Sequence, residues 1–292
     1  MDIHCSPEIT ADSDLNDRRK RRHSDSLMSP AESATVAAEP SPVEGKYVYC
    51  IIRNDRSKDF GEIGIGSASR VYTVSYKDLA AVVSDTPIVI YDPTRENVLA
   101  HEFVNETVMR EFTLIPMSFG TVFRSENDVL ALLKSTYQAF TDVLDKMQDK
   151  IEFGLKILWD RDKVVAAIER ENDEIRRLKD EITRNAASST YFARMQLGRL
   201  VEAAMEEASN RYVTDIHEQL KEVSVASRSN KVIGDRMILN AAFLVDRKDE
   251  KSFDEKVKAI SLQYEDLLTF KYTGPWPPYN FVNIKLKLEK AT

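Results

Sequence analysis

The sequence has no long run of apolar residues, and this absence excludes a membrane-spanning helix. No stretch approaches the roughly 18 consecutive apolar residues that such a helix needs. The first residues, Met1 to Pro7, also lack the basic and then apolar pattern of a secretory signal. We therefore expect a protein of the cytoplasm with no membrane span.

Cysteine and histidine are scarce, which leaves little material for disulfide or metal chemistry. There are two cysteines in 292 residues, Cys5 in a polar segment and Cys50 in an apolar run, so no disulfide framework is implied. None of the histidines has a metal-ligand spacing such as HxxxH, and they lie far apart at His4, His23, His101 and His217. We expect no metal and no cofactor, and we interpret Cys50 as a small core residue.

An excess of basic charge is also missing. The formal net charge is -7 at pH 7, whereas general nucleic-acid binding requires a basic surface that replaces the counterions of the phosphates. We therefore expect no nucleic-acid partner. Hydrophobic residues make up 42% of the chain and charged residues 30%, which is typical of a soluble protein that buries one large core or two ordinary ones.

Catalytic motifs are absent from the sequence as well. Ser118 does not sit in a nucleophile elbow, and the glycine-rich turn Gly61–Gly66 leads into a strand, so it reads as a connector instead of a dinucleotide loop. His101 lies on the apolar face of an expected helix. It is either an acid or base, or a histidine at the edge of the core with both nitrogens hydrogen-bonded, and we favour the second reading. The sequence therefore predicts that the protein is not an enzyme.

Composition divides the chain into three parts. Residues 1–44 have the composition of a disordered tail, because apolar residues are too sparse to offset the entropy of ordering. The tail contains the basic run Arg18–Arg22 followed by Ser24 and Ser26. This run is either an anchor for anionic surfaces that modification can tune, or a solvated charge run, which we favour. We expect one domain at 45–149 and a second at 150–292.

The first domain has the pattern of an α+β unit. Val98, His101, Val104 and Val108 recur at helical spacing, and Asp92–Pro93 supplies a helix start. The strands are expected at 46–52, 70–75 and 79–84, the first helix from 92 to about 110, an extended segment at 114–123, and a second helix from Ser125 to Met147.

The second domain has the element order β-α-β-β-α-β, which is typical of a ferredoxin-like split βαβ sandwich. A long helical insertion replaces its first helix. The final strand is expected at Tyr279–Leu288, where apolar and polar residues alternate. The other strands are expected at 151–159, 223–226 and 237–245, with an extended segment at 269–273 and helices in 164–182, 191–220 and 252–267.

A proline-rich aromatic segment, Gly274–Phe281, is the least ordinary local feature. Its three prolines restrict the backbone, so Trp276, Tyr279 and Phe281 are held in place at small entropic cost. Such aromatics suit a partner-binding surface, and they equally suit a lid over the domain's own core. With Tyr272, which precedes them, they form the candidate partner-binding set.

Several segments resemble the gas vesicle GvpF/GvpL family. The most specific are IPMSFGTV at 115–122, with Pro116, Phe119 and Gly120, and GPWPPYNFV at 274–282. The others are YVYCI at 47–51, LAAVVS at 79–84, His101, and LNAAFLV at 239–245, which contains Asn240. Their order along the chain strengthens the resemblance, which spans about residues 45–288.

The resemblance implies an accessory or minor structural protein of gas vesicle assembly. It implies two domains, the first with a modified ferredoxin-like fold and the second ferredoxin-like. It implies contact with the small hydrophobic shell protein GvpA and with other Gvp accessory proteins, and a chaperone-like role that prevents aggregation, in the cytoplasm or at the gas vesicle. The alternative is a ferredoxin-like regulatory module that binds a small molecule, with Gly61–Gly66 as its loop.

Overall fold

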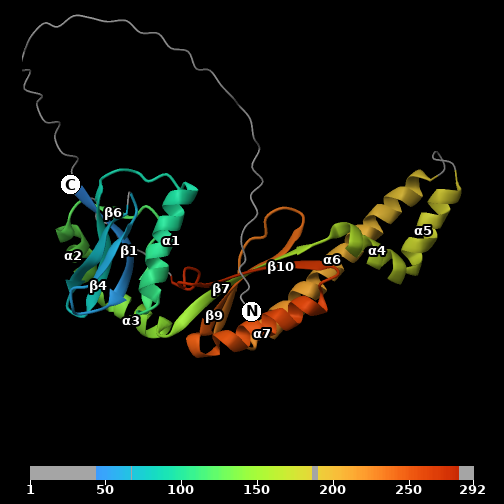
Figure 1. Ribbon diagram of the computed structural model, residues 1–292. Coiled ribbons are helices and arrows are strands. Elements are labelled where there is room, and N and C mark those ends of the chain that lie inside the picture. Colours follow the sequence, from blue (N-terminus) through green and yellow to red (C-terminus); the bar gives the residue numbers. More distant parts are fainter. Residues whose placement is uncertain (1–43, 67, 186–189, 283–292) are drawn as a thin grey trace, which may run out of the picture. The chain divides into compact units, whose positions relative to one another are not determined.

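The computed structural model describes residues 44–66, 68–185 and 190–282 of the chain. Within these ranges the protein consists of two antiparallel sheets, each accompanied by helices (Figure 1). This confirms the predicted α+β class. No helix in the described ranges combines the length and the apolar character needed to cross a membrane.

The first sheet has the strand order β2-β3-β4-β1-β5, and β6 pairs with β1 beside β5. A bulge lies in the central strand β1, between Val48 and Cys50. The bulge lets two successive side chains, those of Tyr49 and Cys50, pack into the same core. The strands are β1 (Glu44–Arg53), β2 (Asp59–Gly64), β3 (Ser69–Tyr76), β4 (Leu79–Pro87), β5 (Leu114–Pro116) and β6 (Val122–Phe123).

Helices cover both faces of the first sheet, which explains why the central part of β1, Tyr47–Ile52, is apolar without interruption. Helix α1 (Arg95–Met109) packs against one face, where Val104 meets the side chains of Tyr47 and Tyr49. Helices α2 (Glu126–Ser135) and α3 (Tyr137–Met147) pack against the other face, which contains Val48 and Ile51. A strand that is buried on both faces needs a continuous apolar run instead of alternation.

The second sheet has the order β10-β7-β9-β8, and each neighbouring pair is antiparallel. Helices α6 and α7 pack against it, and Phe253 of α7 lies 5.4 Å from Phe153 and 5.6 Å from Phe243, measured between ring centroids. The strands are β7 (Lys150–Trp159), β8 (Ala226–Ser229), β9 (Met237–Asp246) and β10 (Leu268–Trp276). The helices are α4 (Arg161–Glu171), α5 (Asp173–Arg184), α6 (Tyr191–Lys221) and α7 (Glu250–Gln263), the last preceded by the short 3-10 helix η1 (Arg247–Asp249).

The elements of this half follow the predicted order β-α-β-β-α-β along the chain. Helices α4, α5 and α6 together occupy the position of the first helix in this order. The ferredoxin-like assignment of each half and the division of the chain near residue 149 stay predictions. A strand was predicted at 223–226, and the corresponding strand in the structure, β8, spans Ala226–Ser229. The predicted tail, residues 1–44, falls outside the described ranges except for Glu44.

Two predictions near the start of the fold were wrong. Most of the glycine-rich segment Gly61–Gly66, expected as a connector, belongs to strand β2. Its pairing with β3 is irregular, and Gly61 has φ of +88°, so the strand carries no alternation that the sequence could reveal. The cap of α1 is Thr94, whose side chain accepts a hydrogen bond from the Asn97 amide, and not Asp92.

Two helices expected as continuous are each divided. The helix from Ser125 to Met147 breaks at Thr136, which separates α2 from α3. The long helical stretch after β7 breaks at Asn172, whose backbone is extended and whose side chain accepts from the amides of Glu174 and Ile175. The apolar spacing continues across both breaks, so periodicity alone did not reveal them. At the second break the sequence does contain a signal, because asparagine is a preferred N-cap residue and Asn172 caps α5.

The last strand of the second sheet also lies earlier than predicted. Strand β10 ends at Trp276, and the described part of the expected strand, Tyr279–Val282, is not a strand, because Tyr279–Phe281 forms a turn. Residues 283–288 of that prediction fall outside the described ranges. Pro277 and Pro278 follow β10 directly, and because neither has a backbone N–H, they end the ladder with β7.

Candidate functional site

The motif residues of the first half meet around Tyr47 and His101. His101 is 1% exposed, and its Nδ1 lies 3.0 Å from the Tyr47 hydroxyl while its Nε2 lies 3.0 Å from the Asn105 side-chain nitrogen. The Gly120 amide donates to the Tyr47 hydroxyl at 2.9 Å. The ring of Phe119 packs 5.8 Å from the His101 ring, between centroids. These residues therefore form one buried, hydrogen-bonded cluster.

His101 is held in its neutral form by this environment. Burial lowers the pKa of His101 to about 4, below its ordinary value of 6.5, because an imidazolium in this apolar cluster loses its hydration. With the Asn105 nitrogen donating to Nε2, the ring proton resides on Nδ1. Through its two nitrogens the ring connects Tyr47 of β1 with Asn105 of α1.

The other two motif residues, Pro116 and Asn240, lie in strands β5 and β9. Pro116 lies in β5 opposite Cys50 of β1. Asn240 lies in β9, where its carbonyl accepts from the Asn230 amide at 2.7 Å and its side chain donates to the Lys231 carbonyl at 2.9 Å. Asn240 therefore secures the loop between β8 and β9 and belongs to a different part of the fold from His101.

Two of the four candidate partner-binding aromatics are engaged within the chain. The Tyr279 hydroxyl accepts from the Asn105 side chain at 2.8 Å and donates to Glu102 Oε1 at 3.0 Å, so it extends the His101 cluster. Burial raises the pKa of Tyr279, and the neighbouring Glu102 carboxylate adds to this. Tyr272 stacks on Phe153 with 5.3 Å between ring centroids, and its hydroxyl donates to Asp254.

Phe281 is half-buried in the turn that follows β10. Its neighbour Asn280 anchors this turn, because the Asn280 amide donates to the Glu152 carboxylate of β7 at 2.7 Å and its side chain donates to the same carboxylate at 2.5 Å. Burial raises the pKa of Glu152, and the two Asn280 hydrogen bonds oppose the rise. The segment is therefore tied down at both Asn280 and Tyr279.

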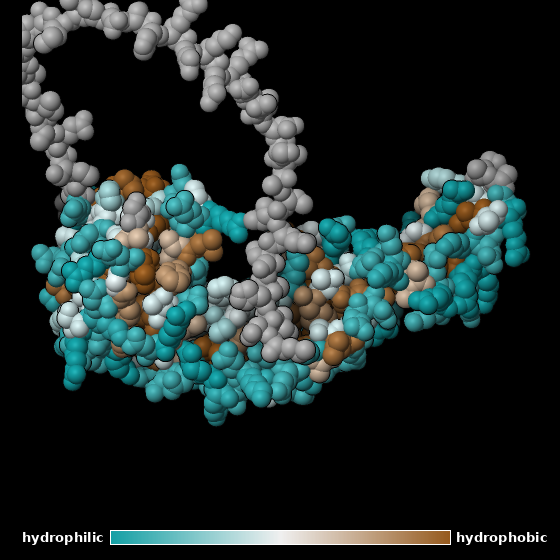
Figure 2. Space-filling model, in the orientation of Figure 1, coloured by the Kyte–Doolittle hydropathy of each residue, from teal (hydrophilic) through white to brown (hydrophobic). Residues whose placement is uncertain are grey.

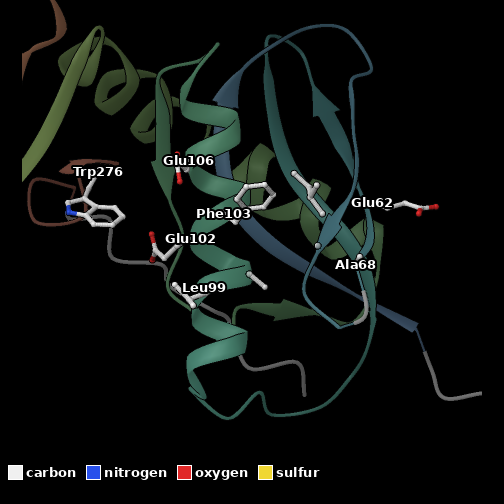
Figure 3. Close-up of a pocket in the computed structure, with 10 residues that line it drawn as sticks. Glu62, Ala68, Leu99, Glu102, Phe103, Glu106 and Trp276 are labelled. Carbon is white, nitrogen blue, oxygen red and sulfur yellow. The ribbon is translucent and has the colours of Figure 1, made fainter. Parts of the chain in front are cut away.

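Trp276 differs from the other three candidates, because its side chain is 37% exposed and lines a groove on the outer face of α1. Leu99 and Phe103 of α1 are 55% and 48% exposed in the same groove. Figure 3 shows Trp276 on one side of α1 and the β2–β3 hairpin, marked by Glu62 and Ala68, on the other. We name this surface the α1 groove. Its volume is about 640 Å³, and it is lined by Glu62, Ile63, Gly64, Ala68, Leu99, Ala100, Glu102, Phe103, Glu106 and Trp276.

The α1 groove is apolar and carries charge of one sign. Its charged lining residues are the carboxylates Glu62, Glu102 and Glu106, and its lining includes no lysine, arginine or histidine. Burial raises the pKa of Glu102, while the hydrogen bond from Tyr279 opposes the rise. Figure 2 shows apolar surface in the region where Figure 1 places α1, within a largely hydrophilic exterior.

Sequence reasoning singled out Trp276, whose partner-binding role stays a prediction, and did not single out Leu99 and Phe103, which line the same groove. The helical pattern directed attention to the stripe that includes His101 and Val104, because that stripe is longer and is buried. The available signal was a second apolar column at i, i+4, since Leu99 and Phe103 fall one turn apart on the side of the helix away from that stripe. A helix with apolar residues on both sides has either a second packing partner in the chain or an exposed apolar face.

Other kinds of chemistry find little support in the described residues. Across 44–66, 68–185 and 190–282, no three His, Cys, Asp or Glu side chains are grouped to hold a metal ion. Cys50 is fully buried, and burial raises the pKa of its thiol, which keeps it protonated. His101 is not among the residues that line the α1 groove.

The fold and this surface define an α+β protein with two helix-covered sheets and an open, acid-lined apolar groove. The model of the family described as gas vesicle synthesis protein GvpL/GvpF matches residues 45–283. The chain therefore belongs to the gas vesicle GvpL/GvpF family, and this membership supports a role in gas vesicle formation.

Individual relatives agree with the family match over most of their length. Gas vesicle protein F1 of Halobacterium salinarum is 32% identical over 250 residues, covering 85% of this chain and 97% of the relative. Gas vesicle protein F of Haloferax mediterranei is 30% identical, covering 76% of this chain and 86% of the relative. Gas vesicle protein L1 of Halobacterium salinarum is 27% identical, with 88% and 97% covered.

Solved structures show the same fold. The crystal structure of GvpF from Anabaena sp. PCC7120 superimposes with a TM-score of 0.73 and 24% identity, covering 83% of this chain and all of that one. The crystal structure of GvpF from Microcystis aeruginosa gives a TM-score of 0.67 and 25% identity, covering 82% of this chain and 99% of that one. Because the Anabaena protein is 24% identical to this chain, its structure supports the fold of the chain and nothing about its function.

Proposed function

We propose that this protein binds the hydrophobic shell protein GvpA, together with other Gvp accessory proteins, and keeps the shell protein soluble until it is assembled. It works through its surface and not through a reaction centre. The observation that carries this proposal is the α1 groove, which is lined by the exposed side chains of Leu99, Phe103 and Trp276. We place the protein in the cytoplasm and, during assembly, at the growing gas vesicle.

The physical argument concerns the shell subunit. A wall that excludes liquid water from a gas space requires subunits with a large apolar face, and such a face aggregates when it is exposed to water. A soluble protein with an ordered apolar groove covers part of that face reversibly. Trp276 suits this role, because a large aromatic side chain that is fixed before binding loses little conformational entropy on contact.

The candidate aromatics then divide into two roles. Trp276 makes direct contact with the partner. Tyr272, Tyr279 and Phe281 belong to the segment that positions Trp276, through the Phe153 stack, the Asn105 hydrogen bond and the half-buried turn.

Co-expression of GvpA with and without this protein tests the proposal. We expect more GvpA in the soluble fraction when the protein is present, and we expect the two to co-purify. A variant with Leu99→Ser and Phe103→Ser is expected to lose both effects. Leu262→Ser is the matched control, because Leu262 is 58% exposed on α7 and does not line the α1 groove. Equal GvpA solubility in all cases, with no co-purification, contradicts the proposal.

The second candidate function is the binding of a small molecule in the same groove, since residues Glu62–Gly64 of the glycine-rich segment line it. The three carboxylates disfavour anionic metabolites such as nucleotides, because like charges repel at a partly desolvated site. This function predicts that a cationic or neutral ligand raises the melting temperature. A flat response of the melting temperature across a metabolite panel removes it.

A further inference from the structure

The arrangement of charge on the α1 groove specifies the kind of partner segment that fits it. On α1, Leu99 and Phe103 are spaced i, i+4, and so are Glu102 and Glu106. Residues at this spacing lie above one another on a helix, so the two pairs form neighbouring columns, one apolar and one acidic. All four side chains line the groove. The groove therefore presents parallel apolar and acidic tracks along the helix axis.

Residues from other elements border the groove on the two sides of α1. Trp276 adds to the apolar surface from the end of β10, and Glu62 adds a carboxylate from β2 (Figure 3). Glu106 also pairs with Arg110 at 3.2 Å. Both side chains of this pair are exposed, and such surface pairs contribute little, so the pair does not cancel the acidic track. Arg110 is not a lining residue.

A partner segment that adds a strand to the first sheet is disfavoured here. The edge strand beside the groove is β2, whose one partner among the described strands is β3. Its pairing register shifts between Asp59 and Gly61 and again between Glu62 and Gly64. An added strand needs a regular row of free N–H and C=O groups, and a doubly bulged edge does not supply one. Helix α1 also contacts β2.

We propose that the α1 groove binds an amphipathic helix of a partner protein whose apolar face is flanked by lysine or arginine side chains. The apolar residues of this helix, spaced i, i+3 or i+4, and i+7, contact Leu99, Phe103 and Trp276. Its basic residues face Glu102 and Glu106 on one side and Glu62 on the other. This inference rests on the proposed function, because it names the part of a partner that the groove receives.

Fluorescence of Trp276 provides a direct readout. The chain has two tryptophans, and Trp159 is 8% exposed in β7, so Trp159→Phe leaves Trp276 as the single emitter. The probes are synthetic peptides of about 18 residues, five turns of helix. One has leucines at helical spacing flanked by lysine, the second has glutamate in place of each lysine, and the third is the lysine peptide with a central proline. We expect a blue shift of Trp276 emission with the lysine peptide alone.

Variants separate groove binding from general attraction to an acidic protein. Leu99→Ser with Phe103→Ser leaves the net charge unchanged, and we expect it to weaken binding of the lysine peptide by about tenfold or more. Glu62→Gln with Glu106→Gln is expected to reduce the preference for lysine over glutamate by about tenfold. Leu262→Ser is the control and is expected to bind like the parent chain. Circular dichroism of each variant verifies that the fold is kept.

Two outcomes overturn the inference. The first is equal binding of the lysine and glutamate peptides, or binding that survives the Leu99→Ser and Phe103→Ser changes. The second is self-association of the parent chain in sedimentation that the same two changes abolish, which assigns the groove to a second copy. If the peptides fail while GvpA is still kept soluble, the inference fails and the proposed function stands. If the lysine peptide binds and GvpA solubility does not change, the proposed function fails instead.

Discussion

The Asn105 side-chain nitrogen donates a hydrogen bond to the Tyr279 hydroxyl at 2.8 Å, which joins residues 174 positions apart in the chain. Asn105 lies on α1, and Tyr279 lies in the turn after β10. The same Asn105 nitrogen lies 3.0 Å from His101 Nε2, and Tyr279 in turn donates to Glu102. The segment that carries Trp276 is therefore connected through Tyr279 to α1, the helix that carries Leu99 and Phe103.

Removal of the Tyr279 hydroxyl is expected to destabilise the protein measurably. Tyr279→Phe leaves the buried Asn105 donor short of one partner and the half-buried Glu102 carboxylate without its hydrogen bond. We expect a loss of about 1–3 kcal/mol in the free energy of unfolding. Urea unfolding of the two proteins measures the difference. Tyr191→Phe is the matched control, because Tyr191 is 63% exposed, and a change within about 0.5 kcal/mol is expected there. Equal effects of the two substitutions would show that the Tyr279 bond contributes nothing.

Much of the fold was predictable because its strands are long and its helices strongly periodic. The central strand β1 was expected at 46–52 and runs from Glu44 to Arg53, and β7 was expected at 151–159 and runs from Lys150 to Trp159. Both are rich in buried apolar residues, several of them β-branched or aromatic, so that local preference and burial agree. The irregular edge strand β2 was missed, because its two register shifts remove the alternation that identifies a strand.

The candidate site was less predictable, for a physical reason. Trp276 was proposed as a candidate because prolines and aromatics are conspicuous in sequence, and its partner-binding role stays a prediction, whereas Leu99 and Phe103 resemble ordinary core residues until the packing of α1 is known. Tyr279 has the same appearance in sequence as Trp276. Only the three-dimensional contact with Asn105 shows that one of them is turned inward and the other outward.

The stability of the protein is expected to depend on pH through His101. The unfolded chain takes up a proton on this histidine near pH 6.5, whereas the folded protein does so only near its lowered pKa of about 4. The stability contributed by the neutral ring is therefore present above pH 6.5 and is lost as the pH falls toward 4. A difference of one pKa unit between the folded and unfolded states corresponds to about 1.4 kcal/mol. The free energy of unfolding is therefore expected to fall by about 3 kcal/mol once the pH is below both pKa values.

Other groups act in the opposite direction, so a variant is needed to isolate this effect. Burial raises the pKa values of Glu102 and Glu152, and their contribution to stability grows as the pH falls through the raised values. His101→Gln keeps hydrogen-bonding capacity and cannot be protonated. We expect this variant to be less stable than the parent at pH 7 and to lose less stability between pH 7 and pH 4.5, measured by thermal unfolding. Parallel stability curves for the two proteins would contradict the assignment.

Two glycines are expected to respond in opposite ways to replacement by alanine. A Cβ on Gly64 falls 2.7 Å from the Ser69 carbonyl oxygen and 2.8 Å from the Tyr49 hydroxyl, so the substitution forces the backbone apart and costs about 1–3 kcal/mol. A Cβ on Gly198 of α6 meets nothing within 4 Å. Gly198→Ala is expected to stabilise the protein by about 0.5–1 kcal/mol, because alanine is the better helix former. Calorimetric melting temperatures measure both, and equal shifts would contradict the described packing of β2.

Trp276→Ala is expected to separate partner binding from stability. Trp276 is 37% exposed, so its loss is expected to cost clearly less stability than Phe153→Ala, which removes a ring that is 1% exposed and is expected to cost about 3–5 kcal/mol. Co-purification of GvpA is expected to fall strongly with Trp276→Ala, since a fixed aromatic in an apolar groove is the residue type that dominates binding energy. Pull-down on the folded variant and its melting temperature are the two measurements. A large drop in melting temperature would instead assign Trp276 to the core, because a side chain that acts only at an interface stabilises nothing when the partner is absent.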